Sequence, residues 1–154
     1  MIKLILSIII AQSAGWAGSV FTAPAIKEWY QFLQKPAISP PNWLFAPVWL
    51  TLYTLIGISL YLIWRGGIYK NPNRYIFLLF ILNLSSNALW SIIFFGMKNI
   101  VAAFVCLISL VGLTLALILV ANEVSKKSAL LLLPYLLWIS YAAVLNGLIW
   151  QLNV

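Results

Sequence analysis

Five long stretches without a charged residue constrain this chain more than any other feature of its sequence. They cover residues 4–26, 36–64, 75–97, 99–122 and 128–154, and the shortest of them has 23 residues. A helix that crosses a membrane needs about 20 consecutive, mainly apolar residues. The sequence therefore predicts an all-α integral membrane protein, with a single domain (1–154) of five transmembrane helices and short connections.

The composition excludes several other classes of protein. Charged residues make up 7% of the chain, against about 25% in soluble domains, so they could not cover a water-exposed surface. The long apolar runs do not alternate with polar residues, as the strands of a β-barrel would. The formal net charge of +7 comes from scattered residues rather than from a dense basic stripe, so nucleic acid is not an expected partner.

The first apolar stretch predicts a helix from about residue 3 to residue 21 that carries a line of small side chains. Ser7, Ala11, Gly15, Ser19 and Ala23 recur every four residues along it. Small residues let helix backbones approach closely in lipid. We interpret this line as a packing face rather than as a ligand site.

The long first connection predicts a short amphipathic helix that begins at about Pro24. Ile26, Trp29, Tyr30 and Leu33 follow at helical spacing, whereas charged and amide residues take the other side. Such a helix lies at the membrane interface or over the mouth of the bundle. Trp29 and Tyr30 would then serve either as headgroup anchors or as part of a lid.

Three of the remaining helices carry a face of aromatic or amide side chains. Two of these helices are predicted at about residues 43–64 and 74–96, and the third is the last helix of the chain, which ends at about residue 151. The helix predicted at 99–122 is mostly aliphatic. The faces consist of Trp49, Tyr53 and Tyr61, of Asn83, Asn87 and Trp90, and of Trp138, Ala142 and Asn146. If they point toward one another, they form an aromatic pocket for a flat hydrophobic molecule. The alternative is that the asparagines only bond the helices together.

The sequence offers few groups for catalysis or for metal binding. It has no histidine, and its only carboxylate side chains, Glu28 and Glu123, lie beside predicted loops. Acid–base catalysis therefore has no candidate group within the spans, and an ion pathway would need intramembrane charges. Haem would lack its commonest axial ligand. We expect no metal site and no required cofactor.

The cationic residues predict how the chain is oriented in the membrane. The N-terminus and the second and fourth connections share one side, which carries Lys3, Arg65, Lys70, Arg74, Lys126 and Lys127. The other side carries Lys27, Lys35 and Lys98. The positive-inside rule then places the N-terminus in the cytoplasm.

Several short motifs follow one another along nearly the whole chain. In order they are Gly15-x-x-Gly18-x-x-x-Thr22, Trp29-Tyr30-x-x-Leu33-x-Lys35-Pro36, Pro40-Pro41, Phe45-x-Pro47-Val48-Trp49, Asn87-x-x-Trp90 and Pro134-Tyr135-x-x-Trp138. In order and spacing they resemble the tryptophan-rich sensory protein/translocator protein family (TspO/MBR). Each motif is weak alone, whereas the ordered set is specific.

This resemblance implies a five-helix bundle, often a homodimer, in a bacterial-type cell membrane. It implies binding of porphyrins such as protoporphyrin IX or haem, in the role of a sensor, carrier or scavenger. The alternative that it implies is an enzyme for light-dependent porphyrin breakdown. The motif for cholesterol in animal members lacks its Tyr and its Lys or Arg in residues 143–150, so cholesterol is not an expected ligand.

The resemblance also implies which residues would act. By position the ligand site would involve Trp49, Asn83, Asn87, Trp90, Trp138 and Ala142, to which the aromatic face of the second helix adds Tyr53. The first loop around Trp29 and Pro40-Pro41 would close the site as a lid. No residue is certain to be catalytic, and Trp49 and Trp138 would be the candidates for photochemistry.

Overall fold

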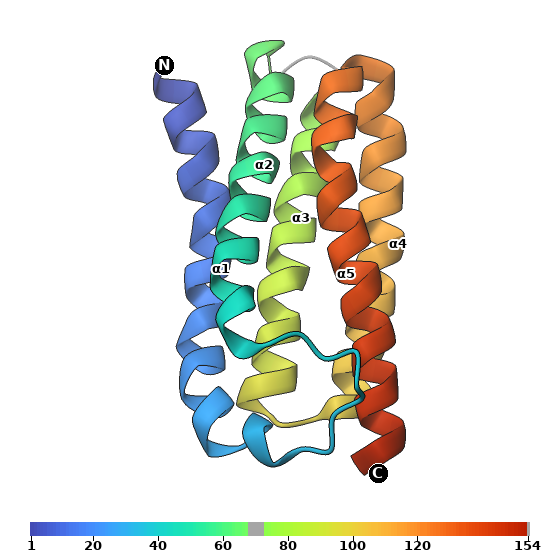
Figure 1. The fold of residues 1–154 in the computed structure, drawn as a ribbon. Coiled ribbons are helices and arrows are strands. Elements are labelled where there is room, and N and C mark those ends of the chain that lie inside the picture. Colours follow the sequence, from blue (N-terminus) through green and yellow to red (C-terminus); the bar gives the residue numbers. More distant parts are fainter. Residues whose placement is uncertain (68–72, 154) are drawn as a thin grey trace.

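The computed structural model describes residues 1–67 and 73–153, and five long helices run side by side in that part of the chain (Figure 1). They are α1 (Ile2–Glu28), α2 (Phe45–Arg65), α3 (Asn73–Ser91), α4 (Ile100–Val124) and α5 (Lys126–Asn153). A π-helical segment, Ile92–Gly96, continues α3, and short 3-10 turns occupy Tyr30–Phe32 and Asn42–Leu44. The predicted five-helix fold is confirmed.

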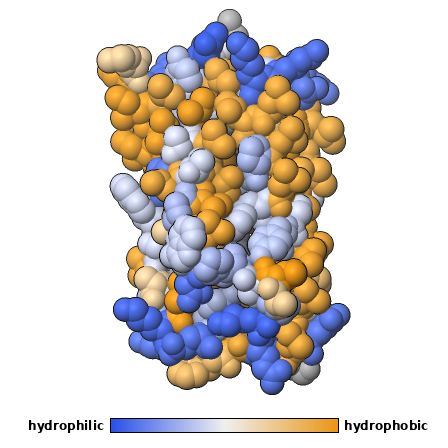
Figure 2. All heavy atoms as spheres, viewed as in Figure 1, coloured by the Kyte–Doolittle hydropathy of each residue, from blue (hydrophilic) through white to orange (hydrophobic). Residues whose placement is uncertain are grey.

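The surface of the bundle matches a membrane environment. Figure 2 shows hydrophilic residues gathered at the two ends and a broad apolar band between them. Large apolar side chains are exposed on every helix, among them Ile9, Leu50, Leu82, Val105 and Leu137. An exposed apolar surface of this extent is stable against lipid acyl chains and unfavourable in water. Because all five helical stretches are also long and apolar enough to span a bilayer, the chain is a multi-pass integral membrane protein.

α1 packs against α2 through small residues in its N-terminal half. Ser7 and Ala11 are fully buried. A Cβ atom added at Gly57 of α2 would lie only 2.6 Å from Cα of Ile8, so the two backbones touch at this crossing. The predicted packing face is confirmed here. The prediction does not describe the C-terminal half of this line of small residues, which borders a cavity instead of packing against a helix along its whole length.

The first connection differs from the prediction in its helix boundaries. α1 does not end near Phe21 but continues to Glu28 with Pro24 inside it, and the following turn is 3-10 rather than a separate amphipathic helix. A proline removes only one helical hydrogen bond, and tertiary packing can offset that loss. The packing partner is on the π-helical segment that follows α3, because Tyr30 is buried with its ring 6.2 Å from that of Phe94. The sidedness of the segment is as predicted, since Gln31 is exposed.

The remainder of the first connection crosses the end of the bundle to α5 before it returns to α2 (Figure 1). The backbone N–H of Gln34 donates to Oδ1 of Asn153 at 2.9 Å, and Nδ2 of Asn153 donates to the carbonyl of Gln34 at 2.9 Å. The hydroxyl of Tyr141 donates to the carbonyl of Ile38. The loop is therefore fastened to α5 at two points.

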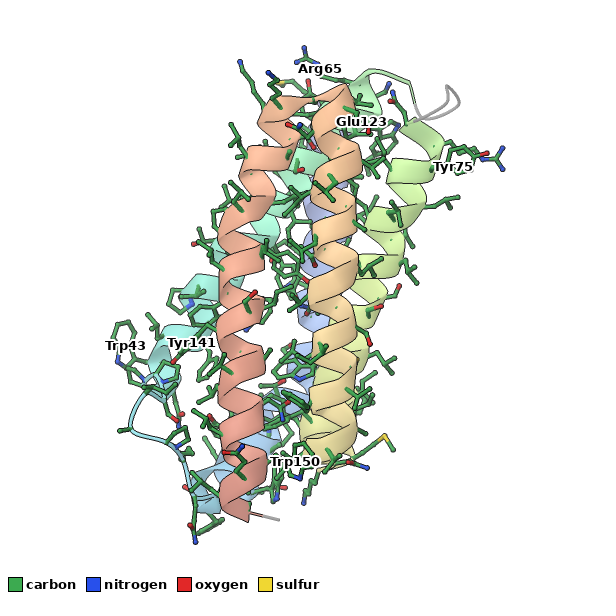
Figure 3. The ribbon with its side chains drawn as sticks, turned by 90° about the vertical axis from the view of Figure 1, so that its right-hand side faces the viewer. Trp43, Arg65, Tyr75, Glu123, Tyr141 and Trp150 are labelled. Atoms are coloured by element: carbon green, nitrogen blue, oxygen red, sulfur yellow. The ribbon has the colours of Figure 1, made fainter. Side chains whose placement is uncertain are left out.

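The two ends of the bundle carry different sets of charged residues. The N-terminus lies at the same end as Arg65 and Glu123, whereas Trp150 and the C-terminus lie at the other end (Figures 1 and 3). The described cationic residues divide between the ends as predicted, and Lys70, which entered that prediction, lies outside the described residues. The cytoplasmic location of the N-terminus stays a prediction.

Candidate ligand-binding site

A cavity of about 530 Å³ lies between α1, the N-terminal half of α2 and the C-terminal end of α3. Its volume falls within the range of roughly 300–1,000 Å³ that is usual for small-molecule sites. On one side is an aromatic wall, formed by Trp49, Tyr53, Trp90 and Phe95. On the other side is a small-residue wall from α1, formed by Gly15, Gly18, Ser19, Thr22 and Ala23.

In the small-residue wall, glycines stand at the points where side chains of α2 and α3 come closest to α1. A Cβ atom at Gly15 would lie 2.5 Å from Cε2 of Tyr53, and one at Gly18 would lie 2.9 Å from Oγ of Ser91. Real Cβ atoms do not approach other atoms so closely. The glycines of α1 therefore leave room both for the rings of α2 and for a space beside them.

Stacking and hydrogen bonds hold the rings of the aromatic wall in place. Trp49 stacks on Tyr53 with ring centroids 5.3 Å apart and planes at 25°, and Trp90 stacks in the same way on Phe94 at 5.5 Å. Nε1 of Trp90 also donates to Oδ1 of Asn146 at 3.3 Å. Fixed ring faces of this kind suit offset stacking with a flat π-system.

A buried hydrogen-bond network, which joins α2, α3 and α5, lies behind the aromatic wall. The hydroxyl of Tyr53 donates to Oδ1 of Asn87 at 2.6 Å, and Nδ2 of Asn87 donates to the hydroxyl of Tyr135 at 3.0 Å. One turn away, Nδ2 of Asn83 donates to Oγ1 of Thr114 on α4 at 2.7 Å. The network satisfies polar groups that hydrocarbon could not, and it fixes Tyr53 at the cavity.

The structure brings only part of the predicted ligand-binding set to the cavity. Trp49, Tyr53 and Trp90 line it. Asn83 and Asn87 lie outside the lining and bond the helices together, which is the alternative that the sequence left open.

The two predicted residues of α5 also lie outside the lining. Trp138 and Ala142 are half-buried against the core. The ring of Trp138 contacts that of Phe45 edge-on, with centroids 6.3 Å apart, and Phe45 lines the cavity. Trp138 therefore supports the lining from behind.

The predicted lid residues lie at the same end of the bundle as the cavity. Trp29 packs edge-on against Phe94 at 5.5 Å, and its neighbour Tyr30 lines the cavity. Pro40 and Pro41 belong to the segment that returns from α5 to α2, close to the Ile38 carbonyl that Tyr141 holds. The first connection thus borders the cavity through Tyr30, which the sequence predicts as an anchor or as part of a lid, and through Asn42, whereas Trp29, Pro40 and Pro41 lie outside the lining.

Sequence reasoning missed the contribution of α1. Gln12 and Trp16 line the cavity together with the small-residue wall. The only signal in the sequence was the spacing of small residues, which predicts close approach equally well when the approach is to another helix.

Two lining residues, Trp16 of α1 and Leu50 of α2, have 65% and 61% of their surfaces exposed, so the cavity reaches the lipid-facing surface of the bundle at these residues. No charged residue lines the cavity, and the described part of the chain holds no cluster of three or more His, Cys, Asp or Glu residues. The site can therefore bury and stack an apolar molecule, and its lining contains no His, Asp, Glu or Lys side chain for acid–base chemistry.

Comparison with known proteins gives consistent matches over almost the full length. The model of the TspO/MBR family matches residues 7–151. The chain is 44% identical to tryptophan-rich protein TspO of Archaeoglobus fulgidus over 154 residues, which are 99% of this chain and 98% of that protein. It is 37% identical to the translocator protein of Ovis aries over 147 residues, covering 94% of this chain and 86% of that protein. It is also 35% identical to protein CrtK of Rhodobacter capsulatus over 141 residues, covering 91% and 86% of the two chains.

Proposed function

Because this chain belongs to the TspO/MBR family, we propose that it binds porphyrins and similar flat hydrophobic molecules in the membrane, as a sensor, carrier or scavenger. The observation that carries the proposal is the cavity of about 530 Å³, in which an aromatic wall faces a small-residue wall. A flat ring system fits in the space beside the contact between Gly15 and the Tyr53 ring, where it can stack on the indoles that line the cavity.

The opening of the cavity supports a ligand that is dissolved in the bilayer. Trp16 and Leu50 at the opening are exposed to lipid, and no charge has to be crossed on the way in. A porphyrin that partitions into the acyl region would reach the aromatic wall without passing through water. This route also fits a carrier or scavenger, which must collect its ligand from the membrane.

Replacing Trp49 or Trp90 with leucine is expected to weaken protoporphyrin IX binding by about tenfold, since each change removes a stacking face and apolar contact area. Titration of the detergent-solubilised protein, read by the porphyrin absorption band, measures the affinity. Trp64→Leu is the matched control, because Trp64 is half-buried against Phe77 at 6.0 Å and does not line the cavity. Equal affinities for all four proteins would show that porphyrin does not use this cavity.

Light-dependent breakdown of the bound porphyrin is a second candidate function, favoured by the three indoles that line the cavity, those of Trp16, Trp49 and Trp90. An illuminated porphyrin converts oxygen into species that oxidise the nearest electron-rich rings, which here include Trp49 and Trp90. We expect bound porphyrin to break down faster than free porphyrin under illumination in air. Trp49→Phe should reduce this difference between the two breakdown rates. Trp138→Phe, outside the lining, should change the rate little. Identical rates for bound and free porphyrin would rule out this activity.

The same proposal includes the assembly and orientation that the sequence predicts. We place the N-terminus in the cytoplasm of a bacterial-type cell, because the end with Lys3, Arg65 and Arg74 also carries Lys126 and Lys127. We also propose a homodimer, as the resemblance to the family implies. Ser7 and Ala11 of α1 are not free to form its interface, because both are fully buried within the bundle.

A further inference from the structure

Ser91 lies in the wall of the cavity, and the fold does not use its hydroxyl. The residue is the last of α3 and is 9% exposed. Its Oγ makes no hydrogen bond with any residue that the structure describes, and it is not among the fully enclosed polar atoms, so it borders open space in the cavity. Ser91 therefore presents a nearly buried but available hydroxyl to whatever occupies the site.

Two other hydroxyls on the cavity, both on α1, are bonded within their own helix. The hydroxyl of Ser19 donates to the carbonyl of Trp16 at 2.8 Å, and that of Thr22 donates to the carbonyl of Gly18 at 3.0 Å. Such bonds back to the preceding turn are the ordinary solution for Ser and Thr in a helix. A hydroxyl without a partner in hydrocarbon is costly, so buried hydroxyls in proteins are nearly always bonded. Ser7 is also without a partner, but its hydroxyl is fully enclosed between helices. On the cavity, the hydroxyls of Ser91 and Tyr30 make no hydrogen bond with the described residues, so both are available to a partner from outside the chain.

Two local features present the Ser91 hydroxyl to the cavity. The helix changes to a π-helix directly after it, where the N–H of Met97 donates to the carbonyl of Ile92, five residues back, at 2.8 Å. Segments of this kind occur often at functional sites. On the facing helix stands Gly18, where a Cβ atom would come within 2.9 Å of Oγ. A larger residue at position 18 would cover the hydroxyl.

We propose that Ser91 is a specificity-determining residue of the cavity, whose hydroxyl donates a hydrogen bond to a carboxylate at the edge of the ligand. This inference rests on the proposed function and deepens it, because it names the group in the cavity that would bind an acidic side chain of the porphyrin. Trp49 and Trp90 stack on the ring system without discriminating its substituents, whereas the hydroxyl selects among them. A serine hydroxyl can serve as donor, and hydrogen bonds to charged acceptors are the stronger ones.

The position of Ser91 along the membrane fits a carboxylate partner. The residue lies close to the end of its helical stretch, which finishes at Gly96 and is followed by Lys98. A carboxylate held there stays near the headgroup region and not at the centre of the bilayer, where an ionised group would be far more costly.

The test compares two probes, protoporphyrin IX with its two propionates and etioporphyrin with alkyl substituents only. We expect Ser91→Ala to weaken protoporphyrin IX binding about three- to tenfold and to leave etioporphyrin binding unchanged. Ser109→Ala is the matched control, because Ser109 lies on α4 and does not line the cavity. Its hydroxyl is already bonded to the carbonyl of Val105 at 3.0 Å, so its loss should change neither affinity. The thermal unfolding temperature of each variant is measured alongside.

Each result of this experiment either supports or overturns the role proposed for Ser91. If Ser91→Ala binds both probes as tightly as the unmodified protein, or weakens both equally, Ser91 does not read a carboxylate and the inference fails. The proposed function then still stands, provided that Trp49→Leu weakens binding. If the unmodified protein binds neither probe, the proposed function fails as well. If Ser91→Ala does not fold, the hydroxyl serves the fold, which also overturns the inference.

Discussion

Replacing Asn87 with leucine is expected to lower the free energy of unfolding by about 2–4 kcal/mol. Asn87 is 1% exposed, and its amide binds the hydroxyls of Tyr53 and Tyr135 at the same time. Single interhelical hydrogen bonds in membrane proteins average only about 0.6 kcal/mol. The larger value expected here arises because two buried hydroxyls lose their partner in one substitution. Titration of the purified protein with SDS in detergent micelles measures the unfolding.

A neighbouring asparagine provides the control for this prediction. Asn83→Leu also removes a buried amide, but its partner Thr114 keeps a second hydrogen bond, to the carbonyl of Leu110 at 2.8 Å. We therefore expect Asn83→Leu to cost less than Asn87→Leu. Adding Tyr53→Phe to Asn87→Leu should restore part of the lost stability, because it removes one of the two hydroxyls left without a partner. Equal losses for the two asparagines, with no recovery in the double variant, would contradict the prediction.

The Asn87 network also links the stability of the bundle to the shape of the cavity. Its bond to Tyr53 fixes a ring on which Trp49 stacks, and both rings line the cavity. An asparagine that never touches the ligand can therefore change ligand affinity by releasing that ring pair. For this reason, a residue of the family motif such as Asn87 can affect ligand binding without contacting the ligand.

The sequence predicts the helices well because each depends on local composition. The five spans follow from the charge-free stretches, and the buried sides of α3 and α5 follow from helical periodicity, as Asn83, Asn87 and Asn146 show. Periodicity identifies which residues share a face, but it does not say which helices become neighbours. The cavity was expected among the second, third and fifth helices, and it lies beside α1 because the glycines of α1 leave space there.

Two further features could not be predicted because tertiary packing decides them. Pro24 is a common helix boundary, yet α1 continues through it while Tyr30 packs between Phe94 and Phe95. The π-helix after Ser91 has no recognised composition signal, and it is the feature that sets two successive phenylalanines, Phe94 and Phe95, into the core. The sequence places Trp90 or Ser91 on the face of Asn83 and Asn87, but it does not predict that the Ser91 hydroxyl lacks a partner.

Replacing Gly57 with alanine is expected to destabilise the protein by about 3 kcal/mol, at the upper end of the usual cost of overpacking. In a free helix the same change stabilises by roughly 0.5–1 kcal/mol. The sign reverses here because the new Cβ would lie 2.6 Å from Cα and 3.1 Å from the backbone nitrogen of Ile8. Backbone atoms cannot rotate away as a side chain can, so α1 as a whole has to move. SDS titration measures the change.

Gly112 provides the matched control, because a Cβ atom added there would meet nothing within 4 Å. Gly112→Ala should therefore be neutral or stabilising, so the two glycine variants are expected to shift stability in opposite directions. A shift in the same direction would show that α1 and α2 are not in backbone contact at Gly57. Since α1 also forms one wall of the cavity, the displacement of α1 in Gly57→Ala should weaken porphyrin binding too, whereas Gly112→Ala leaves it unchanged. A close crossing near one end of α1 thus controls the width of a ligand site further along the same helix.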